Sequence, residues 1–285
     1  MREGAAPVIH LGMGSGIIVA AAFVALAVQS TSNAEAQDGW QPITTYYMPA
    51  STDRCIALQS FQRNGQKLRL GLESRPSTDD YVLLIEGPGN IGRKAWVQGK
   101  IRIAGAKPAK DYSVIEPSSQ ADSLIYLSRV KRAELDAAGR DARLEIIAGS
   151  NSLDFTVPGL GVPLSMLDAY SGELLEKWGY SKEFQRGVAS YPRPEKELRE
   201  YASSSDYPAS AVRAGAMGET HALISVGIDG RGSDCRIIRS SGHAELDSAS
   251  CDIIKKRVRF VTARSLDGTA IAAPAYLTMK WELPR

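Results

Sequence analysis

The chain has 285 residues, of which 44% are hydrophobic and 23% charged, and it contains 26 glycines and 14 prolines. This composition is typical of a globular protein long enough for two domains with separate cores, and it excludes fibrous and broadly disordered classes. The glycine and proline content favours many turns and therefore much β-structure. A formal net charge of +2 lacks the basic excess of nucleic-acid-binding proteins, so we expect no nucleic-acid partner.

The first residues have the organisation of a secretory signal peptide. An apolar run over residues 17–28 is followed by polar residues and by Ala-Glu-Ala at 34–36, a cleavage-site pattern. We therefore predict that residues 1–36 are a signal peptide and that the mature, exported chain begins at Gln37. Counted from Leu11, the apolar segment reaches about eighteen residues, which makes an uncleaved membrane anchor the alternative.

A series of short segments then has the alternation of β-strands. In KLRLGLES, for example, Leu68, Leu70 and Leu72 alternate with polar or small residues, which predicts one buried and one solvent-facing side. The segments are CIALQSF, KLRLGLES, YVLLIEG, KIRIAG, YSVIE, LIYLSRV, RLEIIAG and LDFTVPG. They predict a β-rich, sandwich-like or barrel-like domain over residues 37–180, with two helices in KRAELDAAGRDA and VPLSMLDAYSGELLEKWG.

The remainder of the chain predicts a linker and a second domain. Residues 181–205 are polar and contain Pro192 and Pro194, so we interpret them as the linker. Residues 206–285 predict the order α-β-β-α-β: helices in YPASAVRAGAMG and HAELDSASCDIIKKRVRF, strands in ETHALISVGI, GSDCRIIRSS and AYLTMKWEL. The predicted fold class of the whole chain is therefore α+β.

Two of the three cysteines lie in the second domain. Cys235 is expected near the start of a strand, and Cys251 in the middle of the following helix. In an oxidising compartment two nearby thiols form a disulfide by default, so we predict a Cys235–Cys251 bridge, with two buried free thiols as the alternative. Cys55 is left over, either buried or free.

Motifs that would indicate an enzyme or a cofactor are weak. GPGNIG at 87–92 matches a dinucleotide fingerprint, but the sequence continues as a strand where a helix is required, so we interpret it as a turn. His10, His221 and His243 are too scattered to predict a zinc site. His243 is expected at the entry of a helix, with no nucleophile placed beside it. We therefore predict no enzymatic activity, no metal and no cofactor.

Several short motifs occur one after another in the last part of the chain. They are Tyr-Pro at 207–208, Gly218, Asp-Gly-Arg at 229–231, Ser-Ser-Gly at 240–242, Glu-Leu-Asp at 245–247, Arg-Phe-x-x-Ala-Arg at 259–264 and Trp-Glu-Leu at 281–283. With these motifs at this spacing, residues 206–285 resemble the TonB C-terminal domain family. The resemblance implies a periplasmic domain that binds a short peptide, the TonB box, of an outer-membrane transporter. The partner would then be an outer-membrane TonB-dependent transporter or another envelope protein.

The resemblance implies that the domain binds its peptide by β-augmentation. In this mode an exposed edge strand offers its unpaired N–H and C=O groups to an extended peptide. Carried over to this sequence, the edge is the last strand. Its residues are Ala275, Tyr276, Leu277, Thr278, Met279, Lys280 and Trp281. Alternation puts Tyr276, Thr278 and Lys280 on one face and the residues between them on the other, and the pattern leaves open which face is buried. The sequence also leaves open whether two copies of the chain form a homodimer through the same edge.

The sequence departs from a full TonB energy transducer. The anchor's Ser-x-x-x-His pair is missing, because Ala6 stands four residues before His10, and a β-rich region replaces the long spacer. That region looks like the domain that precedes such C-terminal domains in some alphaproteobacterial TonB-like proteins. We predict a non-enzymatic periplasmic protein that binds by strand addition, with energy-coupled transport as one use. The alternative is a structural module that contacts peptidoglycan through a basic helix end, Lys255, Lys256, Arg257 and Arg259.

Overall fold

The structure, a computed structural model, describes most of the chain after residue 55. The described ranges are 8–10, 41–47, 53, 55–78, 80–90, 97–105, 113–117, 123–139, 141–148 and 151–283. The predicted signal peptide lies outside these ranges except for residues 8–10. Within the described ranges, no helix is long and apolar enough to span a bilayer.

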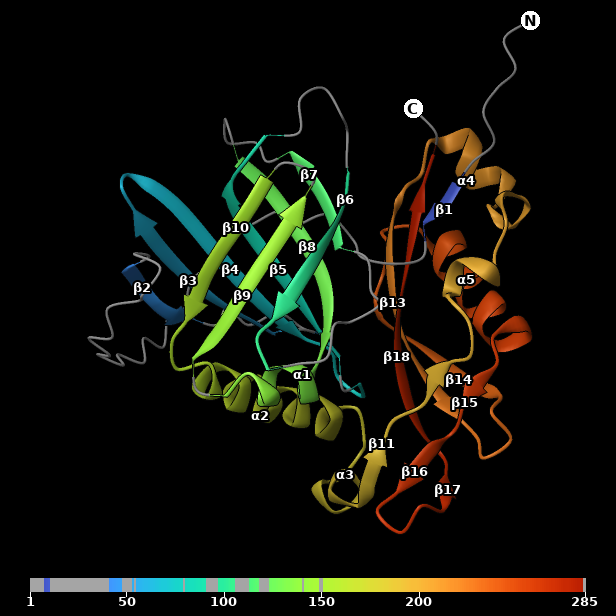
Figure 1. Cartoon of the computed structure of the whole chain (residues 1–285). Coiled ribbons are helices and arrows are strands. Elements are labelled where there is room, and N and C mark those ends of the chain that lie inside the picture. The colour runs from blue at the N-terminus through green and yellow to red at the C-terminus, as the bar shows by residue number, and fades with distance from the viewer. Residues whose placement is uncertain are drawn as a thin grey trace, which may run out of the picture. The chain divides into compact units, whose positions relative to one another are not determined.

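The chain divides into two compact units, each with its own hydrophobic core (Figure 1). The N-terminal unit consists of Ala20–Arg75 and Asp79–Glu173. The C-terminal unit consists of Leu174–Arg285, Met1–Val19 and Pro76–Thr78.

The N-terminal unit is built on a nine-stranded antiparallel sheet with the order β10-β9-β6-β7-β8-β5-β4-β3-β2. Its strands are β2 (Gln41–Tyr47), β3 (Cys55–Arg63), β4 (Gln66–Ser74), β5 (Asp80–Pro88), β6 (Val97–Ile103), β7 (Ser113–Pro117), β8 (Ser123–Lys131), β9 (Ala142–Ala148) and β10 (Asn151–Val157). Every strand predicted for this region from alternation is present, and β2 is an additional one.

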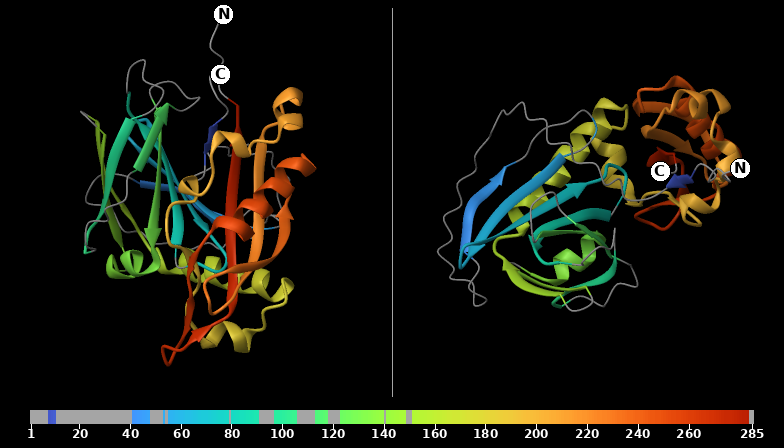
Figure 2. Two further views of the ribbon diagram at one scale, coloured as in Figure 1. Left: turned by 90° about the vertical axis from the view of Figure 1, so that its right-hand side faces the viewer. Right: turned by 90° about the horizontal axis from the view of Figure 1, so that it is seen from above.

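The strands belong to one continuous sheet, where a sandwich would have two facing sheets. The sheet bends round on itself (Figure 2, right), as the right-handed twist of long antiparallel strands allows. Phe61 of β3 and Phe155 of β10 consequently meet edge to face, with 5.9 Å between ring centroids. Of the two helices, α1 (Arg132–Ala137) follows β8, and α2 (Gly161–Lys177) adds Leu164 and Leu167 to the core.

The C-terminal unit contains a four-stranded antiparallel sheet with the order β1-β18-β13-β14. Its strands are β1 (Val8–His10), β13 (Gly218–Val226), β14 (Gly232–Arg239) and β18 (Ala273–Glu282), and its helices α4 (Ala209–Ala214) and α5 (Ala244–Arg257). The predicted order α-β-β-α-β is present as α4, β13, β14, α5 and β18. Helix α4 ends at Gly215, whose φ of 65° is a left-handed conformation that glycine adopts without strain. His243 is the N-cap residue of α5, as expected.

The segment interpreted as a linker is folded. Residues 181–205 contain α3 (Lys182–Gly187), β11 (Val188–Ser190), β12 (Arg193–Pro194) and the 3₁₀ turn η1 (Leu198–Glu200), and η2 (Ser204–Asp206) follows. β11 pairs with β16 (Ala263–Ser265), which also pairs with β17 (Ala270–Ile271), and β12 pairs with β15 (Phe260–Val261). These partners follow α5, about seventy residues later, so no local period in the segment could have shown the pairing. Residues 181–205 therefore belong to the C-terminal unit.

Candidate functional site

The candidate site is the long strand β18 and its outer edge. β18 spans ten residues and pairs along β13 from Gly218↔Trp281 to Val226↔Ala273 without a register shift. On its other side, among the described residues, it pairs near its end with the three residues of β1. A ladder this regular keeps successive peptide groups evenly directed along the edge.

One hydrogen bond shows which peptide groups face outward. The N–H of Tyr276 donates to the Oγ of Ser77, 2.9 Å away in the Pro76–Thr78 part of the same unit, and so is not used in the ladder with β13. Because alternate residues of a strand direct their N–H groups to the same side, Thr278, Lys280 and Glu282 also direct theirs to the outer edge.

One face of β18 is buried beneath α5, which answers the question that the sequence pattern left open. Leu277, Met279 and Trp281 lie in the core together with Ile253 and Ile254 of α5. Trp281 is 0% exposed, and its indole Nε1–H donates to the Oγ of Ser250 at 2.9 Å. Its ring also packs edge to face on Tyr207, with centroids 5.1 Å apart. Trp281 therefore ties the end of β18 to α5 by packing and by a satisfied buried hydrogen bond.

The opposite face of β18 carries a polar and aromatic network. Tyr276 stacks on Trp178 with 5.7 Å between ring centroids, and its hydroxyl is hydrogen-bonded to Nδ1 of His221 on β13. His221 is buried and also contacts Arg239 of β14, and both lie within 4 Å of Glu219. This network covers Tyr276, whereas Thr278 and Lys280 stay partly exposed beside the edge.

Sequence reasoning missed this network. The sequence pattern places Trp178 in a predicted helix, leaves His221 as one of three scattered histidines and gives Arg239 no role. The register places His221 between Thr278 on one side and Arg239 on the other. Alternation alone could have found the group only if the strand register had been known.

β14 forms the other end of the sheet and differs from β18. Its pairing with β13 shifts register at both ends, between His221 and Ala222 and between Ile224 and Val226. The predicted disulfide between Cys235 of β14 and Cys251 of α5 is present, with 5.7 Å between the Cα atoms. β14 is therefore an irregular strand held by a covalent link.

The turn from β14 into α5 is organised by Asp247. Its carboxylate accepts hydrogen bonds from Thr220 Oγ1 and Ser241 N, both at 2.9 Å, and from Ser240 Oγ at 2.5 Å. Burial alone would raise the pKa of Asp247, but the hydrogen bonds from Ser240, Ser241 and Thr220 outweigh it and hold the pKa below its usual value. The ionised carboxylate thereby fixes the Ser-Ser-Gly turn to β13.

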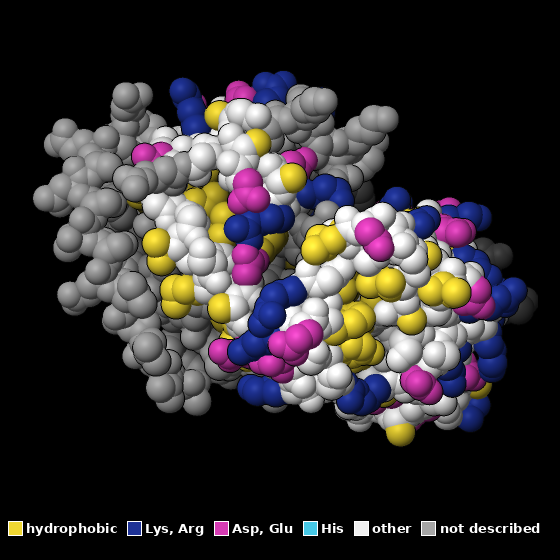
Figure 3. Space-filling view, turned by 90° about the horizontal axis from the view of Figure 1, so that it is seen from below, with side chains coloured by type: hydrophobic (Ala, Val, Ile, Leu, Met, Phe, Trp, Pro, Cys, Tyr) yellow, Lys and Arg dark blue, Asp and Glu magenta, His cyan; other side chains and the backbone are white. Residues whose placement is uncertain are grey.

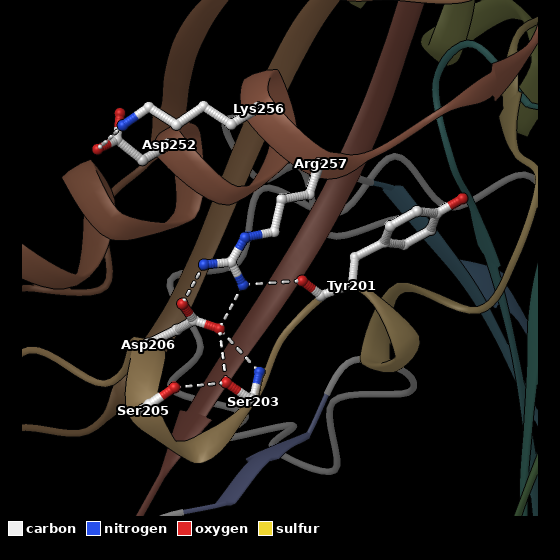
Figure 4. Close-up of polar contacts among 7 residues, drawn as sticks. All are labelled: Tyr201, Ser203, Ser205, Asp206, Asp252, Lys256 and Arg257. Atoms are coloured by element: carbon white, nitrogen blue, oxygen red, sulfur yellow. Dashed lines mark hydrogen bonds and ion pairs between the residues drawn. The ribbon is translucent and has the colours of Figure 1, made fainter.

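The basic end of α5 is engaged within the C-terminal unit (Figure 4). Arg257 forms a two-pronged ion pair with Asp206 at 2.6 and 2.7 Å and donates to the carbonyl oxygen of Tyr201 at 3.2 Å. Lys256 pairs with Asp252 at 2.9 Å. On the face shown in Figure 3, Lys and Arg side chains likewise lie beside Asp and Glu side chains. Two of the four basic residues at this helix end, Lys256 and Arg257, are therefore paired with carboxylates.

The described residues give no support for metal binding or for a reactive thiol. No three His, Cys, Asp or Glu side chains there are grouped so that they could hold a metal ion. Cys55 is free and buried, and burial raises the pKa of its thiol to about 12. The thiol is therefore protonated at neutral pH and unreactive.

The arrangement defines an α+β domain in which a helix supports an antiparallel sheet that contains a long, regular strand, β18. Residues 203–283 match the family described as Gram-negative bacterial TonB protein C-terminal, which confirms the resemblance seen in the sequence. The C-terminal unit thus contains a region that matches the TonB C-terminal domain family. The comparisons found no curated protein and no solved structure similar to the chain.

Proposed function

We propose that this chain is a non-enzymatic periplasmic protein whose C-terminal unit binds an extended peptide by strand addition at β18. The partner is an outer-membrane TonB-dependent transporter or another envelope protein, because proteins with this domain generally interact with such transporters. The observation that carries the proposal is the ten-residue, unshifted ladder of β18 along β13, which directs the N–H of Thr278 to the opposite edge.

The comparison of the two sheet ends favours β18 over β14. Natural proteins protect sheet edges against unwanted pairing with bulges and charged side chains. β14 has both, since its register shifts twice and it carries Asp234, Arg236 and Arg239. β18 has an uninterrupted ladder and only one basic side chain, Lys280, which pairs with Glu282.

The N-terminus decides how far the function extends. If residues 1–36 stay attached as an anchor, the peptide-binding unit can serve energy-coupled transport. If the mature chain begins at Gln37, it acts as a binding module without a motor of its own. Intact mass and N-terminal sequencing of the protein from its native envelope fraction, without reductant, distinguish these two outcomes.

The binding edge is tested with Thr278→Pro, and Thr278→Val serves as the matched control. Proline removes an outward N–H and places its ring where the added strand would lie, whereas valine keeps the N–H and the shape of the side chain. The probe is a set of synthetic TonB-box peptides from transporters of the source bacterium, titrated by calorimetry. We expect Thr278→Pro to weaken binding at least about tenfold and Thr278→Val to leave it nearly unchanged.

Unchanged affinity in a Thr278→Pro protein that keeps its melting temperature would contradict β18 as the binding edge. Contact with peptidoglycan through the end of α5 is not favoured, because Lys256 and Arg257 are already paired with Asp252 and Asp206. Sedimentation with isolated peptidoglycan that disappears as salt is raised would reinstate that alternative.

A further inference from the structure

The outer edge of β18 is closed to an added strand over the first part of its length. The hydrogen bond from Tyr276 to Ser77 shows that the even-numbered residues of this strand direct their peptide nitrogens outward. The first of these is Pro274, which has no N–H to donate. The second is Tyr276, whose N–H donates to the Oγ of Ser77 at 2.9 Å. Thr278 is therefore the first outward position whose N–H can donate to a peptide from a partner.

Both partners of the hydrogen bond between Tyr276 and Ser77 are positioned by their surroundings. Ser77 lies in the turn Pro76–Thr78 between β4 and β5, which belongs to the same unit as β18, and it is 3% exposed. Its φ of 56° is a left-handed conformation that residues other than glycine adopt when the surrounding structure imposes it. The ring of Tyr276 is fixed separately, because it stacks on Trp178 and its hydroxyl is hydrogen-bonded to His221. Donor and acceptor are therefore in place before any partner binds.

The hydroxyl of Ser77 and a carbonyl of an added strand compete for one position. A strand that paired with Tyr276 would have to place a carbonyl oxygen about 2.9 Å from the peptide nitrogen, along the direction of the N–H. The Oγ of Ser77 already lies at that position. Because a peptide N–H has a single hydrogen to donate, pairing with a peptide at Tyr276 and the contact with Ser77 exclude each other.

We propose that Ser77 is a specificity-determining residue that ends the peptide-binding edge, so that the partner's strand pairs with β18 only from Thr278 onward. The proposal rests on the proposed function and specifies its ligand. The ligand is a short extended segment that pairs with the second half of β18, and lengthening it past Thr278 toward Tyr276 adds no hydrogen bond. In an exported chain that begins at Gln37, residues 8–10 are removed with the leader, so β1 does not cover this part of the edge.

The first test measures amide hydrogen exchange by NMR in the exported protein and in two variants, Ser77→Ala and Ser77→Gly. Both variants remove the hydroxyl, and glycine also suits the left-handed backbone, so an effect shared by the two comes from the lost acceptor and not from strain. We expect the amide of Tyr276 to exchange at least about tenfold faster in both variants, while the amides of β13 exchange as in the unaltered protein. An unchanged exchange rate at Tyr276 would overturn the proposal.

The second test titrates synthetic transporter peptides, complete and shortened by one residue at a time from each end, into the unaltered protein and Ser77→Gly. We expect peptides long enough to pass Thr278 to bind Ser77→Gly about threefold to tenfold more tightly, because the N–H of Tyr276 then forms one more hydrogen bond. Peptides that stop at Thr278 should bind the two proteins equally. Equal affinities for every peptide would contradict the limit set by Ser77, even if the amide of Tyr276 exchanges faster.

These results are separate from the test of the proposed function, since Ser77→Gly leaves β18 unaltered. Thr278→Pro tests whether β18 binds the peptide at all. Weaker binding to Thr278→Pro together with equal affinities for Ser77→Gly and the unaltered protein would support the proposed function and overturn only this inference. If no peptide binds the unaltered protein, both are wrong.

Discussion

β18 and β14, the two strands on either side of β13, share one supporting helix but are fastened to it differently. β18 is held to α5 by the buried Trp281, which packs on Tyr207 and donates to Ser250, whereas β14 is held by the disulfide from Cys235 to Cys251. β18 runs unshifted along β13, while β14 is bulged. β18, which is anchored by packing, thus keeps the regular backbone that strand addition needs. β14, which is bulged, is instead held by a covalent link.

Among the substitutions that test this difference, Trp281→Ala is expected to change the stability most. The change leaves a large cavity beneath β18 and removes the hydrogen bond to Ser250, so the free energy of unfolding should fall by about 3–5 kcal/mol. Urea denaturation measures the loss. Leu266→Ala, at a side chain that is 75% exposed, is the control and should change stability by less than about 0.5 kcal/mol. Similar small losses in both variants would show that packing does not anchor β18.

The double substitution Cys235→Ser with Cys251→Ser tests the anchor of β14. Loss of the disulfide should lower the free energy of unfolding by about 3 kcal/mol, because the unfolded chain is no longer constrained. The amides of β14 should exchange faster, while those in the middle of β18 stay protected. A reductant supplies the control, since it should destabilise the unaltered protein but not the double variant. Equal acceleration in both strands would contradict separate anchoring.

Asp247→Asn should have a smaller effect, of about 1–3 kcal/mol, because the neutral amide satisfies the Ser240, Ser241 and Thr220 donors less well. The pKa of Asp247 is lower folded than unfolded, so its stabilisation is fully present above the ordinary aspartate pKa near 4 and is lost as the pH falls through the folded value.

The melting temperatures of the unaltered protein and Asp247→Asn should therefore converge as the pH is lowered from 7 to 3. Asp252→Asn, on the solvent side of the same helix, is the matched control and should shift the melting temperature little at pH 7. A constant gap between the unaltered protein and Asp247→Asn across this range would show that the charge of Asp247 does not fix the turn.

The smallest effect is expected at Cys55, the one thiol outside the disulfide. Its raised pKa and burial predict no alkylation by iodoacetamide in the folded protein at pH 8 and complete alkylation in urea. Mass spectrometry counts the modified thiols. In the Cys235 and Cys251 double variant, Cys55 becomes an internal reporter of whether loosening β14 also opens the N-terminal unit. Rapid alkylation without urea would contradict a buried, protonated thiol.

Local chemistry explains the features that could be predicted from the sequence. Alternation located β3 to β10, because a half-buried strand repeats every two residues wherever its partners lie. Pro208 and Gly215 bracketed α4, and His243 marked the start of α5, because helix ends depend on neighbouring residues. The disulfide could be predicted because Cys235 and Cys251 are 16 residues apart in a chain whose sequence predicts export, and nearby thiols pair in an oxidising compartment.

Contacts between distant segments could not be predicted. The sequence predicts a linker where β11 and β12 lie, because their partners, β16 and β15, follow α5 in the sequence. The curl of the N-terminal sheet brings Phe61 of β3 against Phe155 of β10, a contact that no single strand pattern shows.

The sequence by itself determined strands β3 to β10, the order α4, β13, β14, α5 and β18, the disulfide, and the motifs shared with TonB C-terminal domains. The tertiary structure alone decided that Trp281 and its alternate neighbours face α5, that Trp178, His221 and Arg239 gather around Tyr276, and that β1 lies on the outer edge of β18. The physical reason is that the period of a strand fixes which residues share a face, whereas the identity of each face and the occupant of each edge depend on pairing across long stretches of chain.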